Sequence, residues 1–296
     1  MACVYTIVAY GRDAPSLAAV VERALDEVDR IDRLMSHYRP ESPLSRLNRE
    51  AAQGPVAVEP ELLAFLALCL RYSRESGGAF DVTVGPLMKT WGFFGGEGRL
   101  PDEREIATVL RSVGHAHVAL DSDQGTVRFD RPGVEIDLGG IAKGYAVDRA
   151  VGVLANAAVT AALVSAGGST LYAMGAPPGR KGWEIALEDP LRPQRSARKV
   201  LLRDRALSVA GSRGKSFEAG GVSYSHIMDP RTGRPVRDVL SVAVLADTGA
   251  AGDALDDAFF VMGVSGSQEY LLRLPPTEVL FFLPQGRGWR LVRSAN

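Results

Sequence analysis

The chain has 296 residues, 46% of them hydrophobic and 23% charged, which excludes an intrinsically disordered protein and suffices for one large domain or two smaller ones. A formal net charge of −1 gives no electrostatic footprint for nucleic acid or for an anionic membrane surface. The two cysteines, Cys3 and Cys69, form no CxxC pair, so the sequence predicts neither a zinc site nor a dithiol redox centre.

The N-terminal half carries helices, short strands and two loops. The predicted elements are a strand at 3–10, a helix from Ser16 to Met35, a loop at 36–50, a helix at 59–75, an ordered aromatic and glycine-rich loop at 79–98, a helix at 101–112, a hairpin formed by 117–122 and 126–130, and a strand that ends at Asp137. Ser16 is the expected N-cap of its helix. Pro40 and Pro43 favour the first loop, because proline interrupts the hydrogen bonding inside an element.

The C-terminal half carries most of the strands. The predicted elements are a helix after Gly140, strands at 161–167, 183–189, 207–211, 241–247, 279–283 and 289–293, and a helix at 249–262. Because the strands are grouped with hairpins rather than alternating strictly with helices, the pattern favours an α+β fold.

Neither a membrane span nor a targeting segment is expected. The uncharged stretch between Ala150 and Arg180 contains polar residues and a glycine pair, so it predicts the end of a helix followed by a strand, not a transmembrane segment. The chain enters strand-like sequence at residue 3, with no signal peptide before it. We therefore expect a cytoplasmic protein as the chain stands, and a periplasmic or membrane-anchored one if an export segment has been removed.

The segment AGDALDDAFFVMG contains three carboxylates within a span of five residues: Asp253, Asp256 and Asp257. On a helix, the spacing i, i+3, i+4 stacks these side chains on one face. The surrounding residues are apolar, and a half-buried cluster of like charges needs a counter-charge, which an oxygen-liganded Mg²⁺ or Ca²⁺ would supply. The alternative is a solvated first helical turn, where carboxylates interact favourably with the helix dipole and need no metal.

The segment EIDLGGIAKGYAVDRA predicts an anion site. A strand ends at Asp137, Gly139 and Gly140 allow a tight turn, and a helix begins near Ile141. The free N–H groups and positive dipole end of that helix suit an anion. Lys143 in the first turn is unfavourable for the helix itself, which an anion in front of it would explain. The alternative is a surface lysine after an ordinary strand–helix turn.

Histidines are few. His226 lies among strand-like residues just before the turn signal DPRTG, and by its position alone a structural role is the commoner one. His115 and His117 are expected to point to one face of a strand. Because they lack a third ligand, we interpret them as structural.

Taken together, six segments resemble the FAD:protein FMN transferases, also called ApbE-like flavin transferases. In chain order they are MSHYRPESPLSRLN, GGAFDVTVGPLMKTWGF, IDLGGIAKGYAVDRA, LVSAGG, YSHIMDPRTGRPV and GDALDDAFFVMG, and they span almost the whole chain. The resemblance implies a single ApbE-like domain over residues 1–296, with antiparallel sheets packed against helices in a T-fold-like arrangement. If this domain has two lobes, the FAD and Mg²⁺ site is expected between them.

The resemblance also implies a reaction: Mg²⁺-dependent binding of FAD as a substrate and transfer of its FMN half to a Ser or Thr hydroxyl of an acceptor protein, with release of AMP. Matched by position, it implies FAD contacts at Met1, Tyr38, Ala79, Phe80, Asp81, Asp137, Lys143 and Ile227. It implies Mg²⁺ ligands at the Gly140 carbonyl and the carboxylates of Asp253, Asp256 and Asp257. The expected catalytic residues are His226, Asp253 and Asp257, and either the histidine or an aspartate takes the hydroxyl proton.

This sequence departs from the family where Asp257 replaces a common threonine and Asp256 a non-acidic residue, so tighter divalent-ion binding is expected. The acceptors of the family are subunits of membrane-bound electron-transfer complexes. Two other functions stay open: an FAD pyrophosphatase that yields FMN and AMP, and a non-catalytic FAD carrier. The acidic triplet argues against the carrier, because mere binding needs no metal at the scissile phosphates.

Overall fold

The computed structural model describes residues 3–94, 98–212 and 215–296. Its helices are α1 (Ala14–Met35), α2 (Pro43–Glu50), α3 (Pro60–Glu75), α4 (Gly85–Thr90), α5 (Glu103–Val109), α6 (Ala142–Asn156) and α7 (Gly249–Leu271), with 3-10 turns at Leu110–Ser112 and His115–His117. Its strands are β1 (Tyr5–Tyr10), β2 (Val56–Ala57), β3 (Val118–Asp121), β4 (Thr126–Phe129), β5 (Ala161–Ala166), β6 (Thr170–Met174), β7 (Trp183–Asp189), β8 (Arg192–Leu202), β9 (Arg205–Gly211), β10 (Ser216–Ala219), β11 (Val222–Ser225), β12 (Met228–Asp229), β13 (Arg234–Pro235), β14 (Ser241–Ala246), β15 (Glu278–Gln285) and β16 (Gly288–Ala295).

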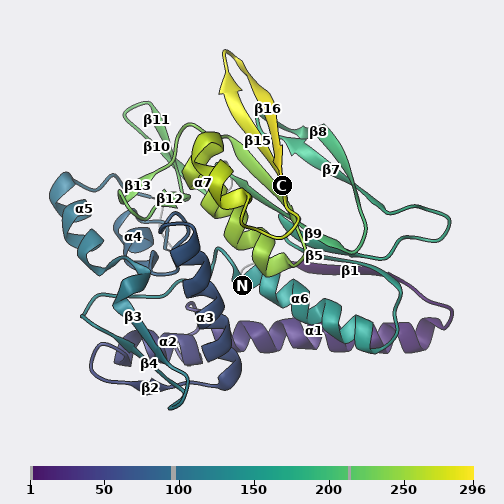
Figure 1. The fold of residues 1–296 in the computed structure, drawn as a ribbon, viewed down its shortest axis with the longest axis horizontal. Helices are drawn as coiled ribbons and strands as arrows, with labels where there is room; N and C mark the ends of the chain where they lie inside the picture. The colour runs from purple at the N-terminus through teal and green to yellow at the C-terminus, as the bar shows by residue number, and fades with distance from the viewer. Residues whose placement is uncertain (1–2, 95–97, 213–214) are drawn as a thin grey trace.

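A seven-stranded sheet with the order β1-β5-β6-β9-β14-β15-β16 lies at the centre of the molecule, and all its neighbouring strands are antiparallel. Helices α6 and α7 pack on one face, with α1 alongside α6, while the β7–β8 hairpin packs on the other face (Figure 1). Strand β14 (SVAVLA) is buried at all six positions because both faces of the sheet are covered.

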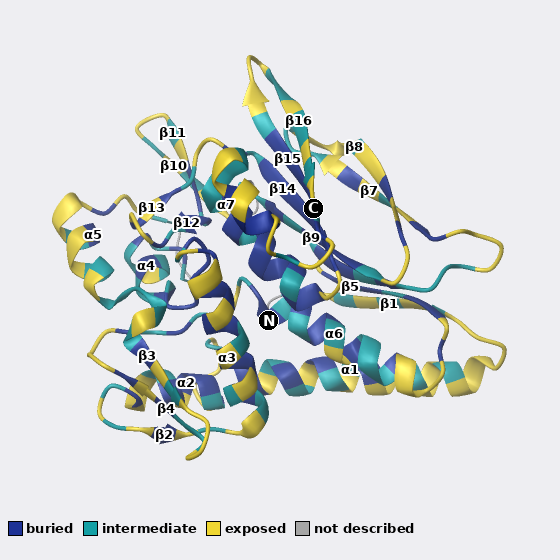
Figure 2. Cartoon of the chain, viewed as in Figure 1, coloured by how far each residue is buried: buried dark blue, intermediate teal, exposed yellow. Residues whose placement is uncertain are grey.

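A second group of elements lies beside this sheet: α2 to α5, the three-stranded sheet β2-β4-β3, and the hairpins β10–β11 and β12–β13 (Figure 1). An aromatic cluster that includes Trp91, Phe93 and Tyr224 joins the β10–β11 hairpin to the region of α4 and α5. Figure 2 shows the buried residues concentrated in the central strands and in α7. The mixture of helices and antiparallel sheets confirms the α+β prediction.

The predicted helix boundaries differ from the structure at two informative places. Helix α1 starts at Ala14 behind the N-cap Asp13, not at Ser16, and Pro15 sits in its first turn, where proline costs no hydrogen bond. Helix α7 continues beyond the predicted end at Met262. The prediction marks a real break, because Gly263 has φ 66° and ψ −177° before the helix resumes.

The prediction of a loop over 36–50 is wrong for its second half, which forms α2. Pro43 occupies the first helical position, where its missing N–H is no loss, and the Ser42 side chain caps the helix by accepting from Ser45 N at 3.0 Å. Proline therefore starts this helix instead of excluding it. Within the loop predicted at 79–98, residues Gly85–Thr90 likewise form the short helix α4.

The predicted strand that ends at Asp137 is also wrong. The segment just before Asp137 forms no hydrogen-bond ladder with another strand of the described chain. Instead, the Asn48 side chain donates to the Ile136 carbonyl and accepts from the Ile136 N–H, each at 2.9 Å. A side-chain amide thus takes the place of a neighbouring strand. His115 and His117 lie in a 3-10 turn and not on a strand. Among the described residues, no helix has both the length and the hydropathy to cross a bilayer.

Candidate active site at the crossing of α6 and α7

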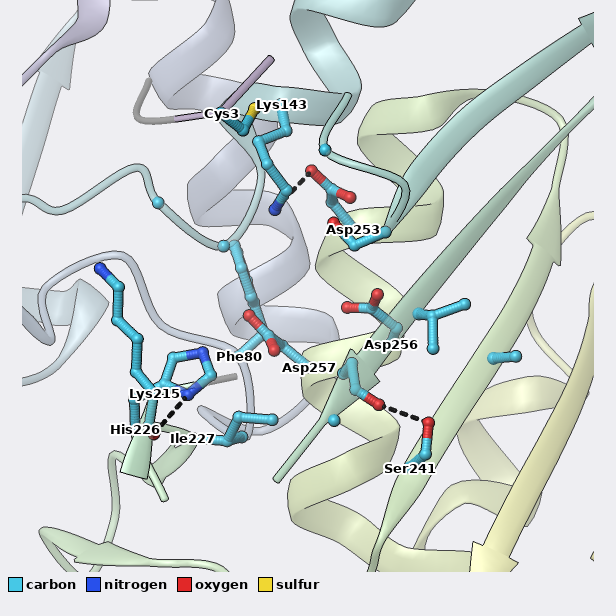
Figure 3. Close-up of a pocket in the computed structure, with 18 of the residues that line it drawn as sticks. Cys3, Phe80, Lys143, Lys215, His226, Ile227, Ser241, Asp253, Asp256 and Asp257 are labelled. Carbon is cyan, nitrogen blue, oxygen red and sulfur yellow. Dashed lines mark hydrogen bonds and ion pairs between the residues drawn. The ribbon is translucent and has the colours of Figure 1, made fainter. Parts of the chain in front are cut away.

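One cavity of about 790 Å³ gathers nearly all the residues that the sequence singled out. It lies where the sheet, the starts of α6 and α7, and the segments before α2 and α4 meet (Figure 3). The predicted residues in its wall are Tyr38, Ala79, Phe80, Asp81, Asp137, Gly140, Lys143, His226, Ile227, Asp253, Asp256 and Asp257. Met1, the remaining predicted FAD contact, lies outside the described residues.

Two glycines let the starts of α6 and α7 approach each other. A Cβ on Gly144 would lie 2.0 Å from the Gly249 carbonyl oxygen, and a Cβ on Gly249 would lie 2.6 Å from the Gly144 carbonyl oxygen. Any side chain at either position would therefore force the helices apart. The same contact pairs each helix start with a carboxylate of the other helix: Asp253 of α7 accepts from Gly144 N at 2.7 Å, and Asp148 of α6 accepts from Gly249 N at 2.6 Å.

Asp253 is buried, and both of its carboxylate oxygens accept hydrogen bonds from the protein. Its side chain is 2% exposed and accepts from Thr170 Oγ1 at 2.6 Å and Ser208 Oγ at 2.7 Å, in addition to Gly144 N. Lys143 Nζ lies 3.8 Å away. The alternative of a solvated helix start is wrong, because Asp253 lies in the second turn of α7 and in the interior.

Lys143 has an anion in front of it, and that anion is part of the protein. The charge of Asp253 is the main influence that raises the pKa of Lys143, so the ammonium stays protonated beside the cavity. Asp253 also takes the Gly144 N–H. The start of α6, predicted as a site for an external anion, is therefore partly occupied by a carboxylate of the protein itself, and Lys143 remains available to a ligand as a cation.

The carboxylates of Asp256 and Asp257 have fewer hydrogen-bond donors beside them than the carboxylate of Asp253. Asp256 is 5% exposed, and its Oδ2 lies 2.7 Å from Ser208 Oγ, whose single hydrogen can go to Asp256 or to Asp253 but not to both at once. Asp257 has no hydrogen bond or ion pair within the described chain, and its Oδ2 lies so close to Gly140 that a Cβ there would be 2.4 Å away. Burial raises the pKa of Asp256 well above its ordinary value, with the neighbouring aspartates adding to it. Burial raises the pKa of Asp257 to about 7, against the opposing charge of Lys143.

This arrangement fits an oxygen-liganded cation. Asp256, Asp257 and the Gly140 backbone offer oxygen donors only, and two buried carboxylates share one nearby ammonium. Asp253 fits less simply as a ligand, because its oxygens are already bonded. Over the described ranges, three or more His, Cys, Asp or Glu side chains do not converge at metal-binding distance. The predicted metal ligands therefore stay a prediction, with Asp256 and Asp257 as its best-placed members.

His226 is placed to accept a proton. Its Nδ1 lies 3.1 Å from the backbone carbonyl of Lys215, and because a carbonyl only accepts, Nδ1 carries the hydrogen and Nε2 keeps a lone pair (Figure 3). Burial lowers the pKa of His226, and the charges of Lys215 and Lys143 lower it further. The imidazole is therefore neutral near pH 7, the form that a general base needs.

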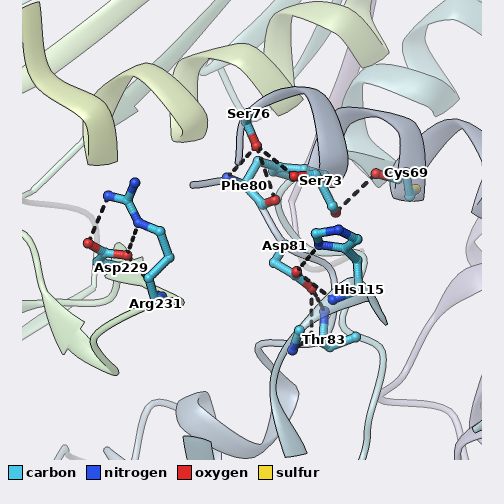
Figure 4. A network of polar contacts seen from close by, with 10 residues as sticks. Cys69, Ser73, Ser76, Phe80, Asp81, Thr83, His115, Asp229 and Arg231 are labelled. Carbon is cyan, nitrogen blue, oxygen red and sulfur yellow. Dashed lines mark hydrogen bonds and ion pairs between the residues drawn. The ribbon is translucent and has the colours of Figure 1, made fainter. Parts of the chain in front are cut away.

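Asp81 uses its carboxylate within the protein. It accepts from Thr83 N at 2.9 Å, Thr83 Oγ1 at 2.6 Å and His115 N at 2.7 Å, and His115 Nδ1 lies 3.1 Å away (Figure 4). The preceding turn is fixed in a similar way, because Ser76 Oγ accepts from Phe80 N at 3.1 Å. Asp81 thus shapes the cavity wall by fixing the turns around it. His115 has the structural role that the sequence predicted.

His37 and Tyr38 line the cavity and pack together with the ring of Phe94. Tyr38 stacks on Phe94 with centroids 5.1 Å apart and planes at 23°, and its ring is 49% exposed. The ring centroids of His37 and Tyr38 are 4.0 Å apart, and His37 Nδ1 lies 3.1 Å from Oδ1 of Asp137, whose carboxylate also accepts from Gly139 N. Sequence reasoning missed His37, Thr170 and Ser208. No local pattern marks them, because their partners are distant along the chain.

Comparison with known proteins agrees with this geometry. The model of the ApbE family matches residues 1–281. The FAD:protein FMN transferase of Treponema pallidum is 34% identical, over 91% of this chain and 80% of that protein, and the one of Vibrio cholerae is 36% identical, over 85% and 75%. The crystal structure of the ApbE protein of Thermotoga maritima has a TM-score of 0.87 at 31% identity, covering 97% of this chain and 92% of its own. The chain therefore belongs to the ApbE family and has its α+β fold.

Proposed function

We propose that this protein is an FAD:protein FMN transferase that transfers FMN from FAD to a Ser or Thr hydroxyl of an acceptor protein and releases AMP, a protein flavinylation. The observation that carries the proposal is the joint presence, in one cavity, of a neutral histidine, a lysine ammonium and two under-neutralised carboxylates. Relatives named FAD:protein FMN transferase match over most of the chain, which supports the same reaction here.

FAD would lie along the cavity wall, its pyrophosphate near Lys143 and its rings near Tyr38 and Phe80. Lys143 supplies the charge that holds the phosphates, since Asp253 keeps its ammonium protonated at the α6 start. The buried residues Ala79 and Ile227 exclude water from the apolar parts of the ligand.

Mg²⁺ would be held by Asp256, Asp257 and the Gly140 carbonyl, with Asp253 bracing this group through Ser208. When bound, the cation supplies charge neutralisation at the phosphates. The remaining chemistry belongs to side chains. Nε2 of His226 takes the proton of the acceptor hydroxyl, the hydroxyl oxygen bonds to the FMN-side phosphorus, and the bond from that phosphorus to the bridging oxygen breaks, so that AMP leaves with the electron pair.

The acceptor would be a subunit of a membrane-bound electron-transfer complex, and the protein would act wherever that acceptor matures.

Product analysis separates transfer from hydrolysis. FAD and Mg²⁺ would be incubated with and without an acceptor fragment carrying a flavinylation-type Ser/Thr sequence, and AMP and free FMN quantified by chromatography. We expect AMP without equivalent free FMN when acceptor is present. Equal amounts of FMN and AMP in both reactions would instead assign an FAD pyrophosphatase.

A further inference from the structure

His37 contributes to the cavity wall from the segment between α1 and α2. Its side chain is 7% exposed, and its Nδ1 lies 3.1 Å from Oδ1 of Asp137. The other ring nitrogen, Nε2, is buried and has no hydrogen-bond partner among the residues that the structure describes. One nitrogen thus lies against a carboxylate of the protein, and the second is left for something outside the hydrogen bonds of the described chain.

A buried polar atom without a partner costs about 1–3 kcal/mol, so such atoms are rare and call for a cause. Within the described chain, only one other buried side-chain nitrogen lacks a partner, Nε of Arg205. That guanidinium is satisfied elsewhere, because its Nη2 donates to the carbonyls of Leu245 and Pro276, and it does not line the cavity. His37 is therefore the unpartnered group at the cavity wall.

The surroundings of His37 indicate what the partner is. The imidazole centroid lies 4.0 Å from that of Tyr38 and 4.7 Å from that of Phe94, and the last two rings are stacked. The ring of Tyr38, which lines the cavity beside one hydrogen-bonding nitrogen, suits a planar heteroaromatic group with a polar edge. Tyr38 is 49% exposed, so such a group can pack on its ring from the cavity.

We propose that Nε2 of His37 forms a hydrogen bond to the polar edge of a planar heteroaromatic half of FAD that packs against Tyr38. The inference rests on the proposed function, which makes FAD the ligand of this cavity. Both halves of FAD, the isoalloxazine and the adenine, have this chemistry. Asp137 acts through His37, since its carboxylate fixes the ring that presents Nε2.

Two substitutions separate the ring nitrogens. His37→Asn keeps an amide near the position of Nδ1, where it can still bond Asp137, and removes the group at Nε2. His37→Gln reaches the position of Nε2. His117→Asn is the matched control, because His117 also places Nδ1 3.1 Å from an aspartate, Asp130, but is no part of the cavity wall.

The full chain would be titrated with FAD, FMN and ADP in Mg²⁺ buffer by calorimetry, after thermal unfolding has established that each variant is folded. We expect His37→Asn to weaken FAD binding at least tenfold and to weaken either FMN or ADP selectively, which identifies the ring. We expect His37→Gln to recover most of the FAD affinity and His117→Asn to match wild type.

An FAD affinity within twofold of wild type in folded His37→Asn would overturn the proposal, as would equal losses for FMN and ADP. If that variant does not fold, His37→Gln decides, because a tenfold loss in this folded variant would also contradict a hydrogen bond from the Nε2 position. A wild-type protein that bound no FAD would overturn the proposed function itself, which distinguishes the two failures.

Discussion

The backbone N–H of Gly144, in the first turn of α6, donates a 2.7 Å hydrogen bond to the buried carboxylate of Asp253 on α7. Asp148 returns the interaction by accepting from Gly249 N and Ala250 N at the start of α7. Each helix start is thus capped by an acid of the other helix, where the dipole favours negative charge. This reciprocal capping fixes Asp253 and, through Ser208, the position of Asp256.

The close approach at Gly144 predicts a large loss of stability for Gly144→Ala. The added Cβ would lie 2.0 Å from the Gly249 carbonyl, a backbone atom that cannot rotate away, so the free energy of unfolding should fall by about 3 kcal/mol or more. Gly152→Ala on the same helix is the control. Its Cβ meets nothing within 4 Å, and it should raise the free energy of unfolding by up to about 1 kcal/mol. Urea unfolding measures both; equal effects would contradict the helix crossing.

Asp257→Thr should weaken Mg²⁺ binding. The substitution removes the one carboxylate of the triplet that has no hydrogen bond within the described chain, and a loss of about tenfold is expected for a ligand of a hard cation. Calorimetric titration with Mg²⁺ in the presence of FAD measures the change. Asp247→Asn, an exposed carboxylate before α7, is the control for net charge and should leave the affinity unchanged. Unchanged affinity in Asp257→Thr would refute the metal assignment.

The pH dependence of transfer should report His226. Protonation of the imidazole removes the base, so the rate should fall on the acid side with a midpoint below 6.5, because burial lowers the pKa of this residue. Lys215→Gln keeps the carbonyl that orients the ring but removes a nearby positive charge. The pKa of His226 should then rise and move the acid limb to higher pH.

The matched control for this shift is Lys181→Gln, an exposed lysine on the loop before β7. Single-turnover rates at saturating FAD, measured from pH 5 to about 8, should be superimposable for this variant and wild type. If the acid limb of the pH–rate profile does not move in Lys215→Gln, the rate does not depend on the titration of His226. Full activity of His226→Ala would assign the base elsewhere.

Asp148 should make stability depend on pH. Burial raises the pKa of its carboxyl from 3.8 to about 7, despite the hydrogen bonds from Ala250 N and Gly249 N. The folded state therefore holds this proton more tightly than the unfolded chain. The stabilisation is complete below about pH 4 and is lost as the pH rises through 7.

Asp148→Asn removes this titration. Between pH 4 and about 7.5 the variant should therefore become more stable relative to wild type, because the free energy of unfolding of the wild type falls and that of the variant does not follow it. Urea unfolding at both ends of the range measures the difference. A constant difference between the two proteins across the range would contradict the raised pKa.

The sequence was sufficient for features that depend on local spacing. The i, i+3, i+4 pattern places Asp253, Asp256 and Asp257 on one face, and the turn through Gly139 and Gly140 leads into α6 as predicted. Pro43 shows the limit of this reasoning, because the residue that breaks a helix interior also suits a helix start.

The bonding of the site could not be read from the sequence. Asp253 meets Gly144, Thr170 and Ser208 across separations of 109, 83 and 45 residues, and no short window contains these pairs. The same holds for His37 and Asp137, which the fold brings together from different segments. Tertiary packing therefore decided which carboxylates are satisfied and which are left for a ligand.

The central claim is that this chain transfers FMN to a protein hydroxyl, and the most direct test is the intact mass of the acceptor. The purified protein would be mixed with FAD, Mg²⁺ and an acceptor fragment carrying a flavinylation-type Ser/Thr sequence, with EDTA in a parallel sample. We predict that the acceptor gains the mass of one FMN residue, that the gain disappears with EDTA, and that replacing the acceptor Ser or Thr with Ala abolishes it. An acceptor of unchanged mass while FAD is converted to free FMN and AMP would contradict the account.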